Sequence, residues 1–185
     1  MIEAELKARV RDPESVTARL DRFADARIEM YQDTYYDAPS GDLGAQDREL
    51  RVRTIRGGGS TRSVLTYKSA RIDEGSGSKR EHETRVEDPD AVGAILRGLG
   101  FVPVLAFQKR CVNYDFSVRG RDVLATLVQV PEIEGTFLEV ETLVQGEHEL
   151  SAALADVRSI ISELGISEND LTTELYTEAV VAHRT

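Results

Sequence analysis

Residues 2–10 alternate strictly between apolar and charged side chains. Over the segment 2–10, one face carries Ile2, Ala4, Leu6, Ala8 and Val10, and the other carries Glu3, Glu5, Lys7 and Arg9. A period of two is typical of a β-strand with one buried face. The alternation returns further along the chain, so the fold has to contain a sheet whose apolar and charged faces are kept apart.

Further strand-like runs follow at regular intervals, separated by turns rich in glycine, serine and proline. Short turns of this kind favour antiparallel neighbours. We expect these strands at about 28–37, 48–56, 62–70, 79–87, 102–117, 121–130 and 136–144.

Three helices are expected between or after the strands. The pairs Asp12-Pro13 and Asp88-Pro89 are helix-start signals, and a third helix at about 147–164 ends at Gly165. A last short element lies near 171–180. Apolar residues recur at helical spacing in the first two helices: Val16, Leu20 and Phe23, then Val92, Ile95, Leu96 and Leu99.

Eight or nine strands with three helices predict an α+β fold. Closure of the antiparallel strands into a barrel removes their exposed edges, and we expect the helices to pack outside it. A chain of 185 residues fits one domain, spanning 1–185.

The charged faces of the strands can look outward to water or inward to a common bore. The outward arrangement is usual for a single antiparallel strand. Here the apolar stripes of the helices need the apolar faces of the strands, which turns the charged faces inward. Buried charges of both signs are costly unless they are paired or bind a ligand and a metal. Such a bore suits Mg²⁺ or Mn²⁺ on carboxylates and polyphosphate on Lys and Arg.

The amino-acid composition excludes some classes of binding partner. A net charge of −10 argues against nucleic acid as a ligand, because nucleic-acid binders need surplus cation. No uncharged stretch is long enough to span a bilayer, so we expect a cytoplasmic protein without a membrane partner. Of 23 basic residues only four are lysines, Lys7, Lys68, Lys79 and Lys109, and we expect a role for at least three of them.

Several motifs occur in the order found in a known family. The segment Glu3-Ala4-Glu5-Leu6-Lys7 resembles the ExExK signature of the CYTH superfamily, the triphosphate tunnel metalloenzymes. The runs Gln32-Asp33-Thr34-Tyr35-Tyr36-Asp37 and Leu65-Thr66-Tyr67-Lys68 are most similar to class IV adenylyl cyclases. The remaining matches are Glu49 to Arg53, Lys79 to Glu83, Leu99-Gly100-Phe101, Lys109-Arg110 with Tyr114, Gly135 to Glu141, and Tyr176.

The resemblance implies an eight-stranded antiparallel tunnel, a homodimer, and a divalent cation, Mg²⁺ or Mn²⁺. It implies a nucleoside triphosphate or another polyphosphorylated small molecule as substrate. The implied metal ligands are Glu3, Glu5, Glu139 and Glu141. The implied substrate-binding residues are Lys7, Arg51, Arg53, Lys68, Arg80, Glu81, Glu83 and Lys109, and the implied catalytic residues are Glu5, Lys7, Lys68 and Lys109.

Three functions are compatible with these residues. The first is conversion of ATP to cyclic AMP and pyrophosphate, and the second is hydrolysis of inorganic or thiamine triphosphate. The third is a diverged lyase or a non-catalytic phosphate binder, motivated by two departures from the family pattern. Cys111 stands where an Arg is usual, with Arg110 expected to point away from the bore, and Gln129 stands where an Asp is common. We expect Cys111 to be a small buried side chain and not a nucleophile.

Overall fold

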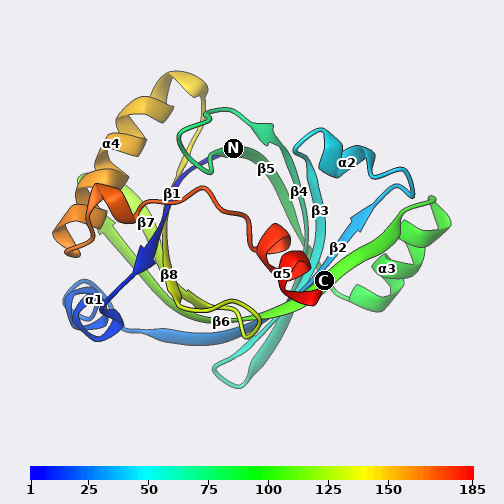
Figure 1. The fold of residues 1–185 in the computed structure, drawn as a ribbon, viewed down its shortest axis with the longest axis horizontal. Helices are drawn as coiled ribbons and strands as arrows, with labels where there is room; N and C mark the ends of the chain where they lie inside the picture. The colour runs from blue at the N-terminus through cyan, green and yellow to red at the C-terminus, as the bar shows by residue number, and fades with distance from the viewer.

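The computed structural model describes residues 1–185, and its eight strands form one closed antiparallel barrel (Figure 1). Around the barrel the order is β1-β5-β4-β3-β2-β6-β7-β8, and β1 pairs with both β5 and β8 to close it. The predicted barrel is confirmed. The strands are β1 Ile2–Val10, β2 Arg27–Asp37, β3 Glu49–Gly57, β4 Ser60–Arg71, β5 Lys79–Val86, β6 Val102–Val118, β7 Arg121–Gln129 and β8 Thr136–Val144.

Five α-helices lie outside the strands, two more than the sequence predicted. They are α1 Pro13–Leu20, α2 Asp42–Ala45, α3 Pro89–Gly98, α4 Glu147–Glu163 and α5 Tyr176–Arg184, with a 3₁₀ turn at Glu168–Asp170. The extra helices are α2 and α5, and α5 overlaps the last short element expected near 171–180. A single turn such as α2 is too short to develop a helical period, and α5 buries only Tyr176 and Val180, which leaves little apolar pattern to detect.

The two predicted helix starts have the expected caps. The Asp12 carboxylate accepts a hydrogen bond from the Ser15 backbone at 3.1 Å, and Asp88 does the same for Ala91 at 2.9 Å. In both cases proline occupies the first turn, where its missing N–H costs nothing.

The main apolar core lies between the outer face of the barrel and its helices. Leu6, Leu138 and Val140 from β1 and β8 pack with Val157 and Ile160 of α4 and with Leu164 just after it, and α1 adds Val16 and Leu20. Because the apolar face of each strand turns outward here, the charged face of the same strand turns into the bore.

α3 covers less of the barrel surface than its apolar stripe predicted. Leu96 packs against Tyr36 and Val52, but Ile95 and Leu99 are 60% and 70% exposed. The helix touches the barrel along one narrow line, so half of its apolar stripe faces outward.

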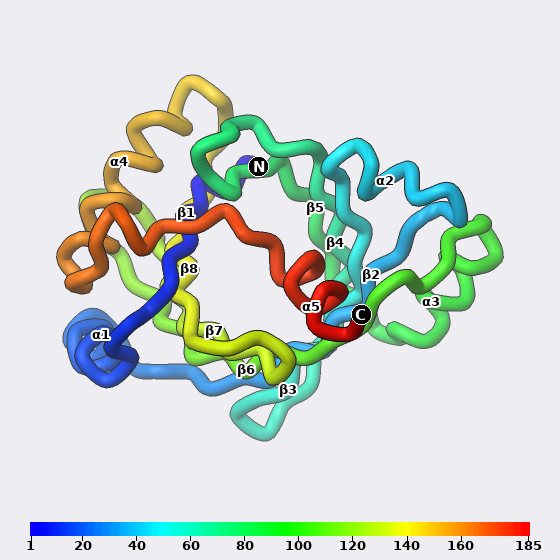
Figure 2. Tube along the Cα trace, viewed as in Figure 1, coloured from blue at the N-terminus to red at the C-terminus, as the bar shows by residue number.

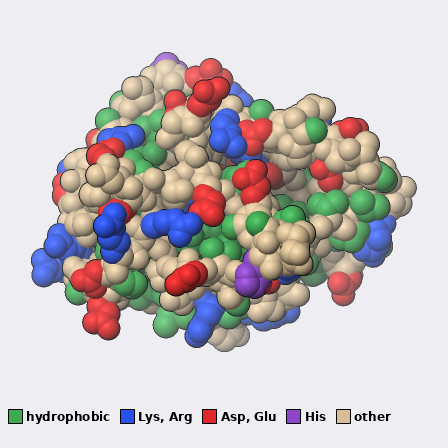
Figure 3. All heavy atoms as spheres, viewed as in Figure 1, with side chains coloured by type: hydrophobic (Ala, Val, Ile, Leu, Met, Phe, Trp, Pro, Cys, Tyr) green, Lys and Arg blue, Asp and Glu red, His purple; other side chains and the backbone are tan.

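The C-terminal segment returns to the barrel and passes across the bore (Figures 1 and 2). Leu171 bridges to Ala8, and the Thr172 backbone donates to the Lys7 carbonyl at 2.9 Å. In the space-filling view the middle of this face is covered by side chains of mixed charge (Figure 3). The segment therefore covers part of the bore.

No helix combines the length and apolar character that a bilayer crossing demands.

Candidate functional site

The bore contains a cavity of about 380 Å³, within the size range of small-molecule sites. Its wall is built from every second residue of the strands, as the alternation predicted. Eleven of the twelve predicted site residues line it: Glu3, Glu5, Lys7, Arg51, Arg53, Lys68, Glu81, Glu83, Lys109, Glu139 and Glu141.

Arg80 is the exception. It lies between Lys79 and Glu81 on β5, so its side chain points to the outer surface and pairs with Glu147 at 3.4 Å. The alternation along β5 excludes Arg80 from the cavity.

One wall of the cavity is acidic. Glu5 on β1 stands directly opposite Glu141 on β8, with Glu3 and Glu139 alongside. Burial raises the pKa of Glu5, and Glu139 raises it further. Burial, with help from Glu3 and Glu5, raises the pKa of Glu141 well above its ordinary value. Like charges on facing strands destabilise a sheet, so a bound cation would stabilise this wall.

The donor set of this wall fits a hard divalent cation, although the protein alone does not close a metal site. No three carboxylate, imidazole or thiol groups are arranged to hold a metal by themselves. Mg²⁺ in proteins is commonly held by one or two carboxylates together with substrate phosphates. Glu3 is engaged with Lys68, which leaves Glu5, Glu139 and Glu141 as carboxylates free of ion pairs.

The opposite wall is basic. Arg51 and Arg53 on β3 and Lys109 on β6 surround the carboxylate of Asp33 on β2. Arg51 is 7% exposed, and its Nε has no hydrogen-bond partner. Burial lowers the pKa of Lys109, although Glu139 opposes the shift. An unpartnered buried guanidinium is a ready binding group for phosphate oxygens.

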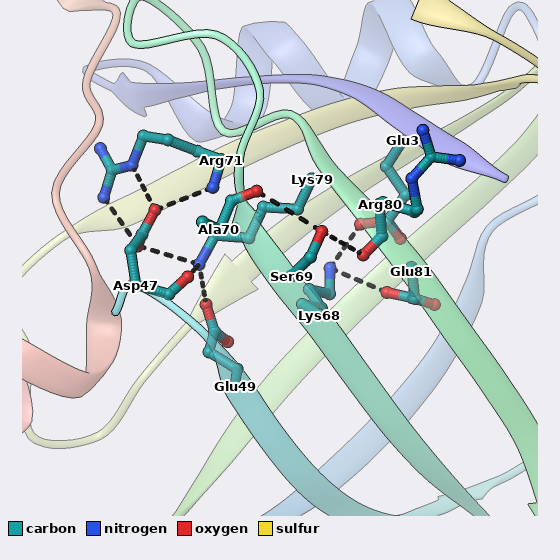
Figure 4. A network of polar contacts seen from close by, with 10 residues as sticks. All are labelled: Glu3, Asp47, Glu49, Lys68, Ser69, Ala70, Arg71, Lys79, Arg80 and Glu81. Carbon is teal, nitrogen blue, oxygen red and sulfur yellow. Dashed lines mark hydrogen bonds and ion pairs between the residues drawn. The ribbon is translucent and has the colours of Figure 1, made fainter. Parts of the chain in front are cut away.

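Two lysines on β4 and β5, the strands between the two walls, are each paired with carboxylates (Figure 4). Lys68 pairs with Glu3 and, at 2.9 Å, with Glu81. Lys79 Nζ donates to Glu49 at 2.7 Å and to the backbone and side chain of Asp47. Burial raises the pKa of Glu3 to about 7, against the opposing effect of Lys68.

The C-terminal segment closes around Lys7. Lys7 Nζ donates to the Glu174 carbonyl and lies 4.4 Å from the centre of the Tyr176 ring. Lys109 lies at the same distance from that ring. Two predicted phosphate-binding lysines thus share one aromatic side chain from α5.

The two departures from the family pattern have different consequences. Cys111 lines the cavity and is buried, and burial raises the pKa of its thiol to about 12, which disfavours the thiolate that a nucleophile needs. Arg110 is exposed and supplies no replacement charge to the bore. Gln129 lies outside the cavity and donates to Thr136 at 3.2 Å. The change from Asp to Gln at position 129 therefore leaves the charge of the cavity wall unaltered.

Sequence reasoning did not assign a role to several residues in or against the bore. Asp33 and Tyr176 belong only to motif matches, and Lys79 belongs to a motif match and to the four lysines. Lys79 shares the inward face of β5 with Glu81 and Glu83, so alternation alone could have placed it. The approach of Tyr176 depends on the return of the chain over the barrel and has no local signal.

Comparison with known proteins identifies the family from nearly the full length of the chain. The model of the CYTH domain matches residues 1–176. The chain belongs to the CYTH family.

Two relatives of this chain carry adenylate cyclase names. A Methanocaldococcus jannaschii protein with a provisional name of that kind is 28% identical over 180 residues, covering 96% of this chain and 98% of its own. The adenylate cyclase CyaB of Aeromonas hydrophila is 27% identical, covering 94% and 86%.

Solved structures agree with the barrel. A Pyrococcus horikoshii protein superposes with a TM-score of 0.83 at 30% identity, covering 97% of this chain and 98% of its own. A Hippeastrum protein, described as an adenylyl cyclase candidate with a dominant triphosphatase activity, has a TM-score of 0.67. At 18% identity, with 98% and 96% of the two chains covered, that likeness is one of fold.

Proposed function

We propose that this CYTH protein is a metal-dependent enzyme acting on a polyphosphorylated small molecule, and that its reaction is conversion of ATP to cyclic AMP and pyrophosphate. The observation that carries the proposal is one cavity with a carboxylate wall on β1 and β8 facing a cation wall on β3 and β6. The adenylate cyclase names of the relatives support the choice of reaction.

Each wall has a part in the chemistry. Glu5, Glu139 and Glu141, with Glu3, would hold Mg²⁺ or Mn²⁺. The bound cation would polarise phosphate oxygens and favour ionisation of a hydroxyl. Arg51, Lys109, Lys68 and Lys7 would neutralise the oxygens of the β- and γ-phosphates.

In the cyclase reaction, the ribose 3′ oxygen forms a bond to the α-phosphorus as the bond to the β-phosphate oxygen breaks. Pyrophosphate leaves and the hydroxyl proton is released. The basic wall favours this step because it meets the charge that develops on the leaving group. No side-chain nucleophile takes part, which agrees with the buried thiol of Cys111.

Triphosphate hydrolysis is the second candidate. The activity described for the Hippeastrum protein supports it, because that protein has the same fold. Water would replace the ribose oxygen and attack the terminal phosphorus, with the same cations holding the phosphates.

Product analysis separates the candidates. Purified protein is incubated with ATP, inorganic triphosphate or thiamine triphosphate, with Mg²⁺ or Mn²⁺. Cyclic AMP with pyrophosphate supports the cyclase, and phosphate release without cyclic AMP supports the hydrolase. Binding without any product leaves a non-catalytic phosphate binder and overturns both enzymes.

The family resemblance also supports a homodimer. Sedimentation equilibrium measures this directly, and a monomeric mass at micromolar concentration would contradict it.

A further inference from the structure

Asp33 is a buried acid that lies among three cations. It is 0% exposed and sits on β2, between the strands that carry Arg51 and Arg53 on one side and Lys109 on the other. An acid at this point competes with a phosphate for the same cations, so its presence in a phosphate-binding wall needs a reason.

The three cations are not bound to Asp33 equally. Arg53 donates twice, from Nε to Oδ1 at 2.7 Å and from Nη2 to Oδ2 at 2.8 Å. Arg51 Nη1 and Lys109 Nζ lie 3.9 Å and 4.0 Å from Oδ2, which is attraction without a hydrogen bond. Their donors therefore stay available.

Arg53 is held on its flat face as well. Its guanidinium stacks over the Tyr31 ring, 4.4 Å from the ring centre. A guanidinium fixed on one edge by a carboxylate and on one face by an aromatic ring has little freedom to reorient. Arg53 is thus a fixed part of the wall, whereas Arg51 keeps a buried Nε without any partner.

We propose that Asp33 is a positioning residue that fixes Arg53 as a structural cation and holds Arg51 and Lys109 apart and pointed at the polyphosphate. The inference rests on the proposed function and divides the roles of the cations within it. One anion among three cations leaves a local excess of positive charge for the ligand. Asp33 also keeps the three cations near one another, where they would otherwise repel and pair with other carboxylates in the bore.

The test is binding of inorganic triphosphate in EDTA, measured by calorimetry, so that the acidic wall and metal play no part. Asp33→Asn should weaken binding about tenfold or more, because the two free cations lose their fixed position. Asp33→Glu, which keeps the charge, should recover part of the loss. Equal or tighter binding by Asp33→Asn would overturn the proposal, since Asp33 would then be only a competitor of the phosphate.

Glu29→Gln is the matched control. Glu29 lies four residues away on the same strand and is also buried in a two-point pair with an arginine, Arg62, at 2.6 Å and 3.1 Å. It should lower the melting temperature and leave triphosphate affinity within about twofold of wild type. An equal loss of affinity in both variants would mean that Asp33 acts only through stability.

A measurement on the wild-type protein covers the case in which Asp33→Asn does not fold. In an NMR titration with triphosphate, the Arg53 Nε–H signal should stay in place while that of Arg51 shifts. A large shift at Arg53 would show that its pair with Asp33 breaks on binding and would overturn the role. Absence of any binding by wild type would instead overturn the proposed function.

Discussion

Charge in the bore is organised residue by residue. Glu5 faces Glu141, and Lys7 faces Glu139, because β1 and β8 pair antiparallel in that register. A shift of one residue in this pairing would turn the charged side chains of one of the two strands outward. The register therefore decides whether these residues form a site.

Glu5→Gln tests the acidic wall. The amide keeps the shape of the side chain and removes one of several repelling charges, so the fold should remain intact. Metal-dependent turnover should fall about a hundredfold or more, because a metal ligand is lost. Circular dichroism and product formation measure the two effects, and Glu87→Gln, at an exposed position outside the cavity, is the control. Normal turnover by Glu5→Gln would refute its assignment.

Asp47, in the loop before β3, connects β4 and β5. Its carboxylate accepts from the backbone and side chain of Arg71 and from Lys79. Burial would raise the pKa of Asp47, but the hydrogen bonds from Arg71 and Lys79 outweigh it and lower the pKa. A carboxyl of this kind stabilises the fold above its unfolded pKa of about 3.9 and loses that effect as pH falls toward the folded pKa.

Asp47→Asn should therefore lower the free energy of unfolding at neutral pH, and its difference from wild type should shrink below about pH 4. Asn tolerates the left-handed backbone at this residue, where φ is 54°. Urea unfolding at pH 7 and in acid measures the difference. A gap that stays constant in acid would show that the charge of Asp47 contributes nothing.

Among the elements, α4 has the largest share in turning the charged faces inward. It covers the outer faces of β1 and β8, which are the strands that carry the four predicted metal ligands. The buried face of the helix and the acidic wall of the cavity are thus opposite sides of the same two strands.

Ile160→Ala tests the packing of α4 against β1 and β8. Ile160 is 1% exposed, and the truncation should cost about 2–5 kcal/mol of stability. Turnover per folded molecule should not change, because the inner face is untouched. Denaturant unfolding measures the loss, and the exposed Ser162→Ala should stay within about 0.5 kcal/mol of wild type. A loss no larger than that of Ser162→Ala would argue against the packing.

At the scale of the whole molecule, one set of residues stabilises the fold and a different set lines the ligand cavity. The main apolar core lies outside the barrel, whereas the cavity inside is lined mostly by polar and charged residues. Removal of metal should therefore leave the barrel folded, and ligand binding should add stability to it.

Inorganic triphosphate with Mg²⁺ at about 100 times its dissociation constant should stabilise the protein by about 2.7 kcal/mol. Thermal unfolding measures the shift, which should shrink with EDTA and in Arg51→Gln. A circular dichroism spectrum that collapses in EDTA alone would contradict the separation of fold and site.

Local patterns were enough to predict the barrel and most of its wall. The period of two in β1, β3, β5 and β8 marks two faces in any sheet, and the helix stripes decide which face is covered. Eleven site residues followed from alternation and from motif resemblance, and the same alternation would have excluded Arg80.

Tertiary structure alone decided the partners of those residues. The pairing of Asp33 with Arg53, and its distance from Arg51 and Lys109, depends on three strands meeting side by side. The stacking of Lys7 and Lys109 on Tyr176 depends on a chain end returning from far along the sequence. Alternation determines which face a side chain takes because it is a property of one strand, whereas contacts between strands require the closed barrel.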